Sequence, residues 1–429
     1  MEPLLIFLYS CVMTPLGRLI SWLGVRVASL RAQCLGRFLS KSEREVLREQ
    51  CHGRRTFLVF ASSAGEYEQA LPLVKRFEAD HPDLLPVLIF FSESGVTFAK
   101  SQGESRLFCK APWDDYFAWR LLLKAIEPQF TIVVRYELWP NFLYQAKSYG
   151  PVYLVNGVES PRVSRNRLVR LVKRRLIAGI DRIFVVGSRD QDFFLETLGA
   201  SREQIVVTGD TKYDRVRERA EERQAKLSDI QGRLNQSWPR RNCFILGSAW
   251  HKDVQLGFDS FKKCGKTQQW RLIVAPHDIS SDMLAWVESQ AKACDIQLCK
   301  FTQLDQLASH HDGILVDVIG VLPELYGCAE LAMVGGAMHH RVHNVLEPAV
   351  RGLYLCFGPL YHTSKEAEAL VSEQLAKVVT NSKELTDWWQ SLSIDVGDRF
   401  EQLVEHVNRM TGASDRIKDE IEKRTKISG

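Results

Sequence analysis

The sequence predicts an α/β protein made of two doubly wound domains, preceded by an apolar N-terminal segment. Its 429 residues exceed what a single core accommodates, so two domains of roughly 200 residues each are expected. From residue 57 onward, short runs of β-branched and aromatic residues alternate with longer helical patterns. That alternation is typical of parallel sheets covered by helices on both faces.

Strand-like runs fall into two groups along the chain. The first group covers residues 57–62, 85–91, 130–135, 151–157, 181–188 and 204–210. The second group covers residues 243–249, 270–277, 312–318, 330–336 and 353–359. Each group is long enough to build one parallel sheet.

A charged stretch separates the two groups. It has few strand-forming residues and ends in Trp-Pro-Arg-Arg, which indicates a partly helical interdomain connection. A long helical pattern follows the last strand from about Ser382. The predicted divisions are an N-terminal anchor segment over 1–40, a first α/β domain over 41–211, a connection over 212–242 and a second α/β domain with C-terminal helices over 243–429.

The composition and charge exclude several classes of protein. With 45% hydrophobic and 25% charged residues, the chain has the makeup of a folded globular protein rather than a disordered one. A net charge of +4 is too small for a dedicated nucleic-acid-binding protein. The ten cysteines form no C-x-x-C pair, so a reducing compartment is expected and a cysteine metal site is not.

The N-terminal segment has the character of a membrane anchor. Residues 3–17 are apolar, but about fifteen residues are fewer than the roughly 20 that a membrane-spanning helix needs. The segment begins with Glu2 rather than a basic residue and shows no cleavage pattern, so a removed signal peptide is not expected. Residues 18–37 then interleave arginines with Leu, Ile, Trp and Val, as a helix lying in the membrane interface does. The alternative is a helix packed on the first domain.

The turn after the first predicted strand is a candidate ligand site, because doubly wound domains bind ligands at the carboxyl ends of their strands. It reads Ser-Ser-Ala-Gly-Glu before a helical pattern. Ser63 and Gly65 are small enough for a ligand to approach the backbone, and the helix start offers free N–H groups to an anion. Glu66 is either a general base or a first-turn acid that complements the helix dipole by about 0.3–1 kcal/mol. The chain has no G-x-G-x-x-G, so a dinucleotide site is not supported.

A second candidate follows the strand at residues 130–135. Glu137 and Trp139 come just after this strand, and Pro140 suits the first turn of the next helix. A carboxylate and an indole at a strand end would suit a sugar or another polar ring. The alternative for Trp139 is that it covers the core.

A basic run follows in residues 162–175. Its cations alternate with Leu, Val and Ile, so one helix face is basic and the other is apolar. Such a helix fits an anionic membrane or a phosphorylated lipid, where each cation contributes about 1 kcal/mol. A solvated helix face is the alternative, and nucleic acid is disfavoured because aromatic residues are missing.

In the second domain, several polar residues follow strands and are expected to converge on one crevice. Ser248 and His277 follow two strands, and a helix is expected to begin near His343 or Asn344 and to offer its N-terminus to a phosphate. Glu347 would lie about one turn inside that helix, within reach of a ribose. No G-x-S-x-G elbow is present. A metal site formed by His339, His340 and His343 is the weaker alternative, because no further ligand stands at a suitable spacing.

Together these residues resemble the Kdo transferases, which move 3-deoxy-D-manno-octulosonic acid (Kdo) from a cytidine monophosphate (CMP) donor to lipid A precursors. The resemblance covers nearly the whole chain. Its motifs are SSAGE at 62–66, ELWPN at 137–141, SRDQDFFLETLG at 188–199, VTGDTKYD at 207–214, LGSAWHKD at 246–253, GVLPELYGCAELAMVGG at 320–336, HNVLEP at 343–348 and FGP at 357–359.

The resemblance implies a GT-B fold, in which two Rossmann-like domains face a central cleft, and an inverting transfer that needs neither a metal nor a cofactor. CMP-Kdo would be the donor and a lipid A precursor the acceptor. The protein would act at the cytoplasmic face of the bacterial inner membrane, without a nucleic-acid partner.

The resemblance also implies roles for individual residues. Glu66 matches the general base of the family. The acceptor and sugar side would comprise Ser63, Gly65, Glu137, Trp139, Ser160 and Lys212. The donor nucleotide would be held by Ser248, His277, Gly335, Gly336, His343, Asn344 and Glu347. Phosphorylated lipid at the membrane would contact Arg162, Arg165, Arg170, Lys173 and Arg174.

The chain departs from the family pattern at four places. Arg135 stands where a glutamate is usual, Val158 where an arginine is usual, and Pro276 where an arginine is usual in a Pro-Arg-His motif. Arg341-Val342 replaces the glycine pair before His343. These changes make an altered sugar specificity, or a non-catalytic relative that binds lipid or a partner, the alternatives to a Kdo transferase.

Overall fold

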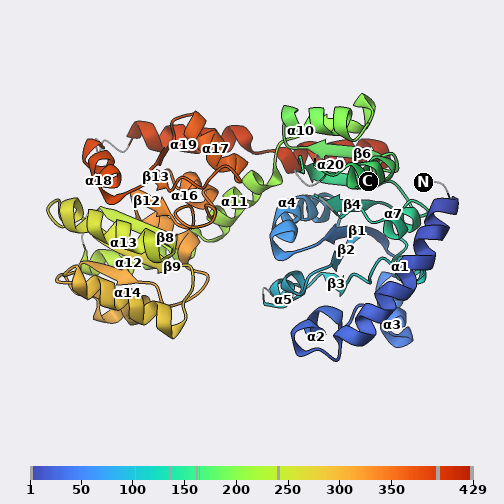
Figure 1. Ribbon diagram of the computed structural model, residues 1–429, viewed down its shortest axis with the longest axis horizontal. Coiled ribbons are helices and arrows are strands. Elements are labelled where there is room, and N and C mark those ends of the chain that lie inside the picture. Colours follow the sequence, from blue (N-terminus) through green and yellow to red (C-terminus); the bar gives the residue numbers. More distant parts are fainter. Residues whose placement is uncertain are drawn as a thin grey trace. The chain divides into compact units, whose positions relative to one another are not determined.

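The computed structural model describes residues 3–101, 103–135, 137–160, 163, 165–238, 242–392 and 397–425. The chain divides into two compact units (Figure 1). The first unit comprises residues 1–215 and 410–429, and the second comprises residues 216–409. Each unit contains one parallel seven-stranded sheet.

The sheet of the first unit has the strand order β3-β2-β1-β4-β5-β6-β7, which is a doubly wound arrangement. The order in which successive strands are added reverses between β1 and β4, which pair directly and in parallel. The strands are β1 Arg55–Ala61, β2 Leu84–Phe90, β3 Leu107–Lys110, β4 Thr131–Val134, β5 Val152–Gly157, β6 Arg182–Val185 and β7 Ile205–Val207. The helices are α1 Pro3–Gly24, α2 Ala28–Cys34, α3 Lys41–Cys51, α4 Ala64–Asp80, α5 Glu93–Ser101, α6 Tyr116–Ile126, α7 Pro140–Ala146, α9 Arg167–Ile177, α10 Ser188–Asp192, α11 Thr211–Glu222, which enters the second unit, and α20 Ala413–Thr425.

Both faces of this sheet are buried because side chains alternate along each strand. In β1, Leu58 and Phe60 point into one core, which helices α3, α6, α7 and α9 cover. Phe57 and Val59 point into the other core, which α4, α5 and α20 cover. Strands buried on both faces are continuous apolar runs, which is why the sequence pattern located them.

The second unit repeats this plan with the strand order β10-β11-β9-β8-β12-β13-β14. Here the order of strand addition reverses between β8 and β12, which also pair directly and in parallel. The strands are β8 Cys243–Ala249, β9 Arg271–Pro276, β10 Leu298–Lys300, β11 Gly313–Leu315, β12 Leu331–Val334, β13 Tyr354–Phe357 and β14 Ala376–Val378. The helices are α12 Gln224–Ser237, α13 His251–Ser260, α14 Ser281–Ala293, α15 Leu322–Leu325, α16 Leu346–Val350, α17 Lys365–Ser372, α18 Ser382–Ser391 and α19 Gly397–Met410.

The predicted fold of two doubly wound domains is confirmed, with three strands that the sequence pattern missed. Strands β3, β10 and β14 have only three or four residues each and lie at the edges of their sheets. Their side chains are partly exposed, so they lack the continuous apolar run of a buried strand.

The boundary between the two units differs from the predicted one, which placed a separate connection over residues 212–242. Helix α12 belongs to the second unit, because Leu227, Ile230 and Leu234 are buried and Arg223 pairs with the fully buried Glu324 at 2.9 Å. The segment is therefore a packed helical part of that unit rather than a separate connection.

The C-terminal helix also lies elsewhere than predicted. Helix α20 returns to the first unit and packs against α4 (Figure 1). Ile417 and Ile421 are fully buried there, and Arg182 pairs with Glu420 at 2.6 Å. The sequence predicted that residues 243–429 form one domain, whereas the structure places the last helix in the first unit.

Helix α1 is long and apolar enough to cross a membrane by length and composition. One of its faces is nevertheless fastened to the first unit. Ser10 donates to Asn141 Oδ1 at 2.6 Å, Arg18 pairs with the buried Asp115 at 2.8 Å, and Trp113 Nε1 donates to Ser21 Oγ at 2.7 Å.

The opposite face of α1 carries large apolar side chains that are exposed. They are Leu4, Leu5, Phe7, Leu8, Val12, Leu16, Leu19, Ile20, Trp22 and Leu23. An exposed apolar stripe of this length marks an interaction surface.

The packing of α20 gives a direct test of the fold. Ile421→Ala should lower the free energy of unfolding of the first unit by about 2–5 kcal/mol, because it removes buried methyl groups and leaves a cavity. Urea unfolding followed by tryptophan fluorescence measures the change. The matched control is Ile319→Ala, since Ile319 is 83% exposed and should leave the midpoint unchanged. Equal midpoints for both variants would contradict the docking of α20.

Candidate active site

The structure brings the two polar turns of the first unit to neighbouring strands. Ser62 to Glu66 follow β1, and Arg135 to Trp139 follow β4, at the point where the strand order of the sheet reverses. Doubly wound domains bind ligands at such a point. At Gly65, no atom lies within 4 Å of the position that a Cβ would take, so the approach to the backbone is open.

Glu66 lies half-buried in the first turn of α4. The Ser62 N–H donates to its Oε2 at 2.5 Å, and its own N–H donates to Ser63 Oγ at 3.4 Å. The carboxylate also receives a backbone hydrogen bond from Ser63. Burial raises the pKa of Glu66 to about 7, and the nearby Glu137 carboxylate adds to this rise. The Ser62 N–H and the Arg135 guanidinium act in the opposite direction.

Glu137 is the second carboxylate of this site. Burial raises its pKa, whereas hydrogen bonds from Ser62 and Trp139 and the charge of Lys173 lower it. The Trp139 ring packs edge-on against Phe60 at 5.2 Å and against Phe91 at 4.7 Å between ring centroids. Both sequence interpretations of Trp139 therefore apply, because it covers the core and also orients Glu137.

Arg135, one of the departures from the family pattern, is held inside the first unit. Its backbone is left-handed, with φ of 59°. Its Nε donates to Gln69 Oε1 at 2.6 Å, and its Nη2 lies 3.3 Å from Asp210 Oδ2. The buried Asn156 bonds to the same Gln69 and to Thr211, so this network ties α4 to the ends of β4 and β5 and the start of α11.

The other predicted acceptor residues lie further along the same sheet edge. Ser160 is half-buried after β5, and its carbonyl accepts from the Val163 N–H at 3.0 Å. Lys212 is half-buried in the first turn of α11, where its N–H donates to Asp210 Oδ1 at 2.9 Å. Val158, where the family usually has arginine, is buried.

The predicted lipid-binding cations Lys173 and Arg174 lie on helix α9. Lys173 Nζ donates to the Leu138 carbonyl at 3.4 Å and so faces the turn that carries Glu137. Arg174 donates to the carbonyls of Thr197 and Glu196, so it is bound to the main chain. Arg174 is nevertheless exposed, and the expected contact of both cations with phosphorylated lipid stays a prediction.

The remaining predicted lipid-binding cations of this region differ in exposure. Arg165 is exposed and Arg170 is half-buried, whereas Arg162 lies outside the described residues. Three apolar side chains of α9, Leu168, Leu171 and Val172, are exposed beside them.

In the second unit, the predicted donor residues gather where β8, β9 and β12 end. Ser248 has a left-handed backbone with φ of 51°. A Cβ on Gly335 would lie 2.3 Å from the Ser248 carbonyl oxygen, and a Cβ on Gly336 would lie 2.3 Å from the Arg341 carbonyl oxygen. Glycine is therefore required at both positions by the close approach of two turns.

The buried Asp253 fixes this pair of turns. Its Oδ2 accepts from the N–H groups of Trp250 and Gly336, both at 2.9 Å. Sequence analysis did not single out Asp253 or Trp250. The available signal was an acidic residue three positions after Trp250 at a helix start, which is the spacing of a capping box.

Three aromatic rings stack at the same place. His277 stacks on Trp250 at 4.6 Å and on His343 at 4.4 Å between ring centroids. The Trp250 indole donates to His343 Nε2 at 3.1 Å, which requires the tautomer with the proton on Nδ1. Burial lowers the pKa of His343 to about 4, and the nearby His277 and Arg341 act in the same direction.

The predicted helix at His343 and Asn344 begins later than expected. Helix α16 starts at Leu346 and has five residues, so its N-terminus does not form the phosphate site that the sequence suggested. Asn344 Oδ1 instead accepts from the Leu346 N–H at 3.1 Å. Glu347 lies in the first turn of α16 and pairs with Arg219 at 3.5 Å.

The histidines before this helix form a turn rather than a metal cluster. The N–H groups of His339 and His340 donate to the Gly336 carbonyl at 3.0 and 2.8 Å, and both side chains are exposed. No group of three or more His, Cys, Asp or Glu side chains could hold a metal ion in the described ranges.

The Trp250–His343 hydrogen bond predicts how the pKa of His343 responds when the indole is removed. Trp250→Phe should raise the pKa of His343, because the indole N–H stabilises the neutral imidazole. A pH titration of the histidine ring nitrogens by NMR measures this pKa. The control is Trp286→Phe, which removes an indole that packs against His251 instead. An unchanged His343 pKa in Trp250→Phe would contradict the assigned hydrogen bond.

Comparison with known proteins agrees with this geometry. Residues 35–215 match the family model described as 3-deoxy-D-manno-octulosonic-acid transferase. The chain is 27% identical to 3-deoxy-D-manno-octulosonic acid transferase of Chlamydophila psittaci, with 72% of this chain and 71% of the relative covered. It is 26% identical to the protein of the same name from Aquifex aeolicus, with 76% of this chain and 83% of the relative covered.

Solved structures show the same fold at low sequence identity. A glycosyltransferase from Rickettsia africae is 12% identical with a TM-score of 0.58, covering 88% of this chain and 100% of its own. The UDP-GlcNAc 2-epimerase of Neisseria meningitidis is 14% identical with a TM-score of 0.62, covering 86% of this chain and 100% of its own. The GT-B class expected for the two domains is therefore confirmed, and the chain is similar to the 3-deoxy-D-manno-octulosonic-acid transferases, both in the family model over its first unit and in relatives along most of its length.

Proposed function

We propose that this protein is a membrane-associated glycosyltransferase that moves Kdo, or a similar acidic sugar, from a CMP-activated donor to a lipid A precursor. The single observation that carries the proposal is the placement of Glu66, a carboxyl with a pKa of about 7, at the open end of β1. Relatives that cover most of the chain bear the name 3-deoxy-D-manno-octulosonic acid transferase, which supports the sugar.

Glu66 acts as the general base of this reaction. Its carboxylate takes the proton from the acceptor hydroxyl while that oxygen attacks the anomeric carbon of the sugar. The bond from the anomeric carbon to the CMP phosphate breaks, the electron pair leaves with the phosphate, and the configuration inverts. A base with a pKa near 7 suits this step, because it is ionised often enough at neutral pH and still binds a proton well. The reaction needs no metal.

The second unit binds the CMP part of the donor. The neutral His343 presents its Nδ1–H at the ends of β8 and β12, and within the described part of the chain this group has no hydrogen-bond partner. A phosphate oxygen is a good acceptor for such a donor. Glu347 bonds the ribose, and its partner Arg219 holds it in place until then.

The protein lies on the cytoplasmic face of the inner membrane, with α1 along the surface rather than through it. The contacts of Ser10, Arg18 and Ser21 extend over most of the helix, and all of them would break if α1 moved into the bilayer. The exposed apolar face of α1 contacts the acyl chains, as in other interfacial helices.

The base is tested by Glu66→Gln. This variant should lose about 10²–10⁴-fold in the rate of transfer, because the amide cannot accept the hydroxyl proton. Transfer is measured as CMP release from CMP-Kdo with a lipid A precursor in detergent. The control is Glu203→Gln, an exposed acid outside both candidate sites. An active Glu66→Gln would overturn the assignment of the base.

The pH profile is a separate test of the same group. In wild type, kcat/KM should rise with pH and level off above about pH 7, because only the ionised Glu66 can take a proton. In Glu137→Gln this midpoint should move to lower pH, since the neighbouring negative charge that raises the pKa of Glu66 is gone. A midpoint that stays in place, or moves upward, would exclude Glu66 as the titrating group.

The donor site is tested by calorimetric titration with CMP. Wild type should bind CMP, and Glu347→Ala should weaken binding by about tenfold, because a ribose hydroxyl loses a charged acceptor. Glu368→Ala, which removes a half-buried acid paired with His362, is the matched control. CMP binding without any transfer would favour a non-catalytic relative, and transfer from another acidic sugar donor would favour an altered specificity.

A further inference from the structure

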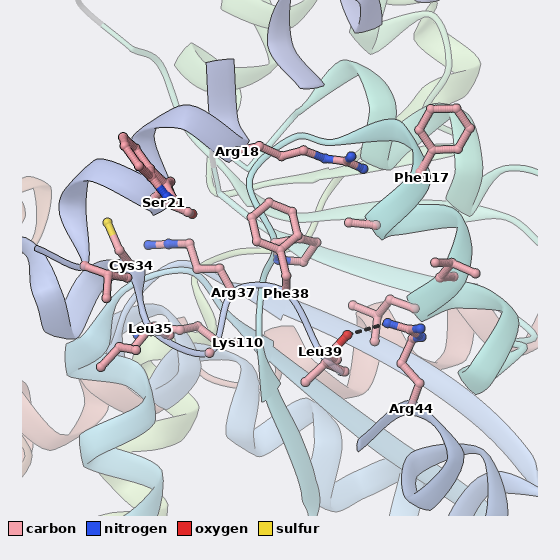
Figure 2. Close-up of a pocket in the computed structure, with 17 residues that line it drawn as sticks. Arg18, Ser21, Cys34, Leu35, Arg37, Phe38, Leu39, Arg44, Lys110 and Phe117 are labelled. Carbon is pink, nitrogen blue, oxygen red and sulfur yellow. Dashed lines mark hydrogen bonds between the residues drawn. The ribbon is translucent and has the colours of Figure 1, made fainter. Parts of the chain in front are cut away.

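A cavity of about 560 Å³ lies beside the C-terminal half of α1 (Figure 2). Its walls come from α1, from the segment between α2 and α3, from the residues after β3 and from α6. The volume falls within the roughly 300–1,000 Å³ of ligand pockets. None of the residues assigned above to the acceptor, sugar or donor lines it.

The charges at this cavity are all of one sign. The cations Arg18, Arg37, Arg44 and Lys110 line it, whereas no acidic residue is among its described lining residues. Two of these cations are neutralised elsewhere, because Arg18 pairs with Asp115 and Lys110 pairs with Glu93.

Arg37 and Arg44 lack such neutralisation. Arg37 donates to the carbonyls of Gln33, Ala111 and Phe91, and Arg44 donates to the carbonyl of Leu39. Neither guanidinium has a carboxylate within ion-pair distance among the described residues.

Of these two arginines, Arg37 is the stronger evidence for an anion-binding site, because its side chain is buried. The residue is 3% exposed, and its guanidinium stacks on the rings of Phe91, at 4.3 Å, and Trp113, at 4.2 Å. Burial lowers its pKa to about 10, so the group still carries its charge at neutral pH. The charge of Glu93, which is paired with Lys110, acts against this lowering of the Arg37 pKa. Because no carboxylate among the described residues lies within ion-pair distance of Arg37, an anion in the cavity would further offset the cost of burying this cation.

The remaining wall of the cavity is apolar and leads to the surface. Phe38, Leu39 and Leu122 line it, and the exposed side chains Trp22, Leu35, Phe117 and Leu121 also belong to the lining. An occupant therefore needs an anionic head and a long apolar tail.

We propose that this cavity binds one anionic phospholipid of the membrane, with its phosphate at Arg37 and Arg44 and an acyl chain along the apolar wall. The bilayer is the source of the ligand, because the opening lies among exposed apolar side chains of α1 and α6. The proposal goes beyond the transfer reaction and relies only on the membrane location proposed above.

The bound lipid would also stabilise the surroundings of the first site. The aromatic rings stacked on Arg37 connect to the first site through Trp139. Phe91 contacts Trp113 at 5.7 Å and Trp139 at 4.7 Å between ring centroids. Trp139 in turn bonds to Glu137.

The test is native mass spectrometry of the full chain in a neutral detergent, with palmitoyl-oleoyl phosphatidylglycerol or the zwitterionic phosphatidylcholine of the same chains added. Wild type should retain one phosphatidylglycerol and little phosphatidylcholine. Arg44→Gln should reduce retention about fivefold, as expected for the loss of one cation near an anionic lipid. Ala118→Trp, which fills the cavity from α6, should abolish it.

The matched control is Arg48→Gln, which removes an exposed cation from the same helix α3 outside the cavity and should retain the lipid as wild type does. Equal retention in Arg44→Gln and Arg48→Gln, or equal retention of the two lipids by wild type, would overturn the proposal. Retention of a lipid A precursor alone would also overturn it and would assign the cavity to the acceptor. Because the readout is lipid retention rather than CMP release, its result is independent of the transfer tests.

Discussion

The site of the first unit depends on the hydrogen bonds that the buried side chain of Asp114 accepts. It accepts the N–H groups of Asn141 and Phe142 at 3.1 and 3.0 Å, which are free donors at the start of α7. It is also hydrogen bonded to Tyr9 of α1, and burial raises its pKa to about 6. Helix α7 begins one residue after Trp139, so one carboxylate fixes both the turn that carries Glu137 and the placement of the N-terminal helix. The N-terminal helix and the turn that carries Glu137 thereby share one anchor.

Asp253 has the same role in the second unit as Asp114 has in the first. A doubly wound sheet delivers its ligand-binding turns from strands that are distant in sequence, so something must hold those turns in register. In both units this is a buried carboxylate that accepts two backbone N–H groups, from Asn141 and Phe142 in one and from Trp250 and Gly336 in the other. Such bonds to a charged acceptor are stronger than neutral ones, and removing the acceptor would leave two buried donors unpaired.

Local patterns account for what the sequence could predict. Central strands are continuous apolar runs and were located to within a few residues, whereas the edge strands β3, β10 and β14 are too short and too exposed to show a period. In the site, Glu66 was found because small residues and an acid directly follow a strand. The Trp250–His343 bond joins residues 93 positions apart, and the Asp114–Asn141 bond joins residues 27 apart. Only tertiary packing brings these pairs together, so no local pattern indicates them.

Arg135 stands where the family pattern has a glutamate, and its surroundings explain why this change need not abolish the site. An unpaired arginine beside Glu66 would hold that carboxyl ionised and weaken it as a base. Arg135 is instead turned toward Gln69 and Asp210, which neutralises its charge and connects it to the network around Asn156. Its remaining effect on Glu66 is smaller than those of burial and of Glu137, and the pKa of Glu66 stays at about 7. Arg135 therefore supports this turn through Gln69 and Asp210, and it only partly opposes the raised pKa of Glu66.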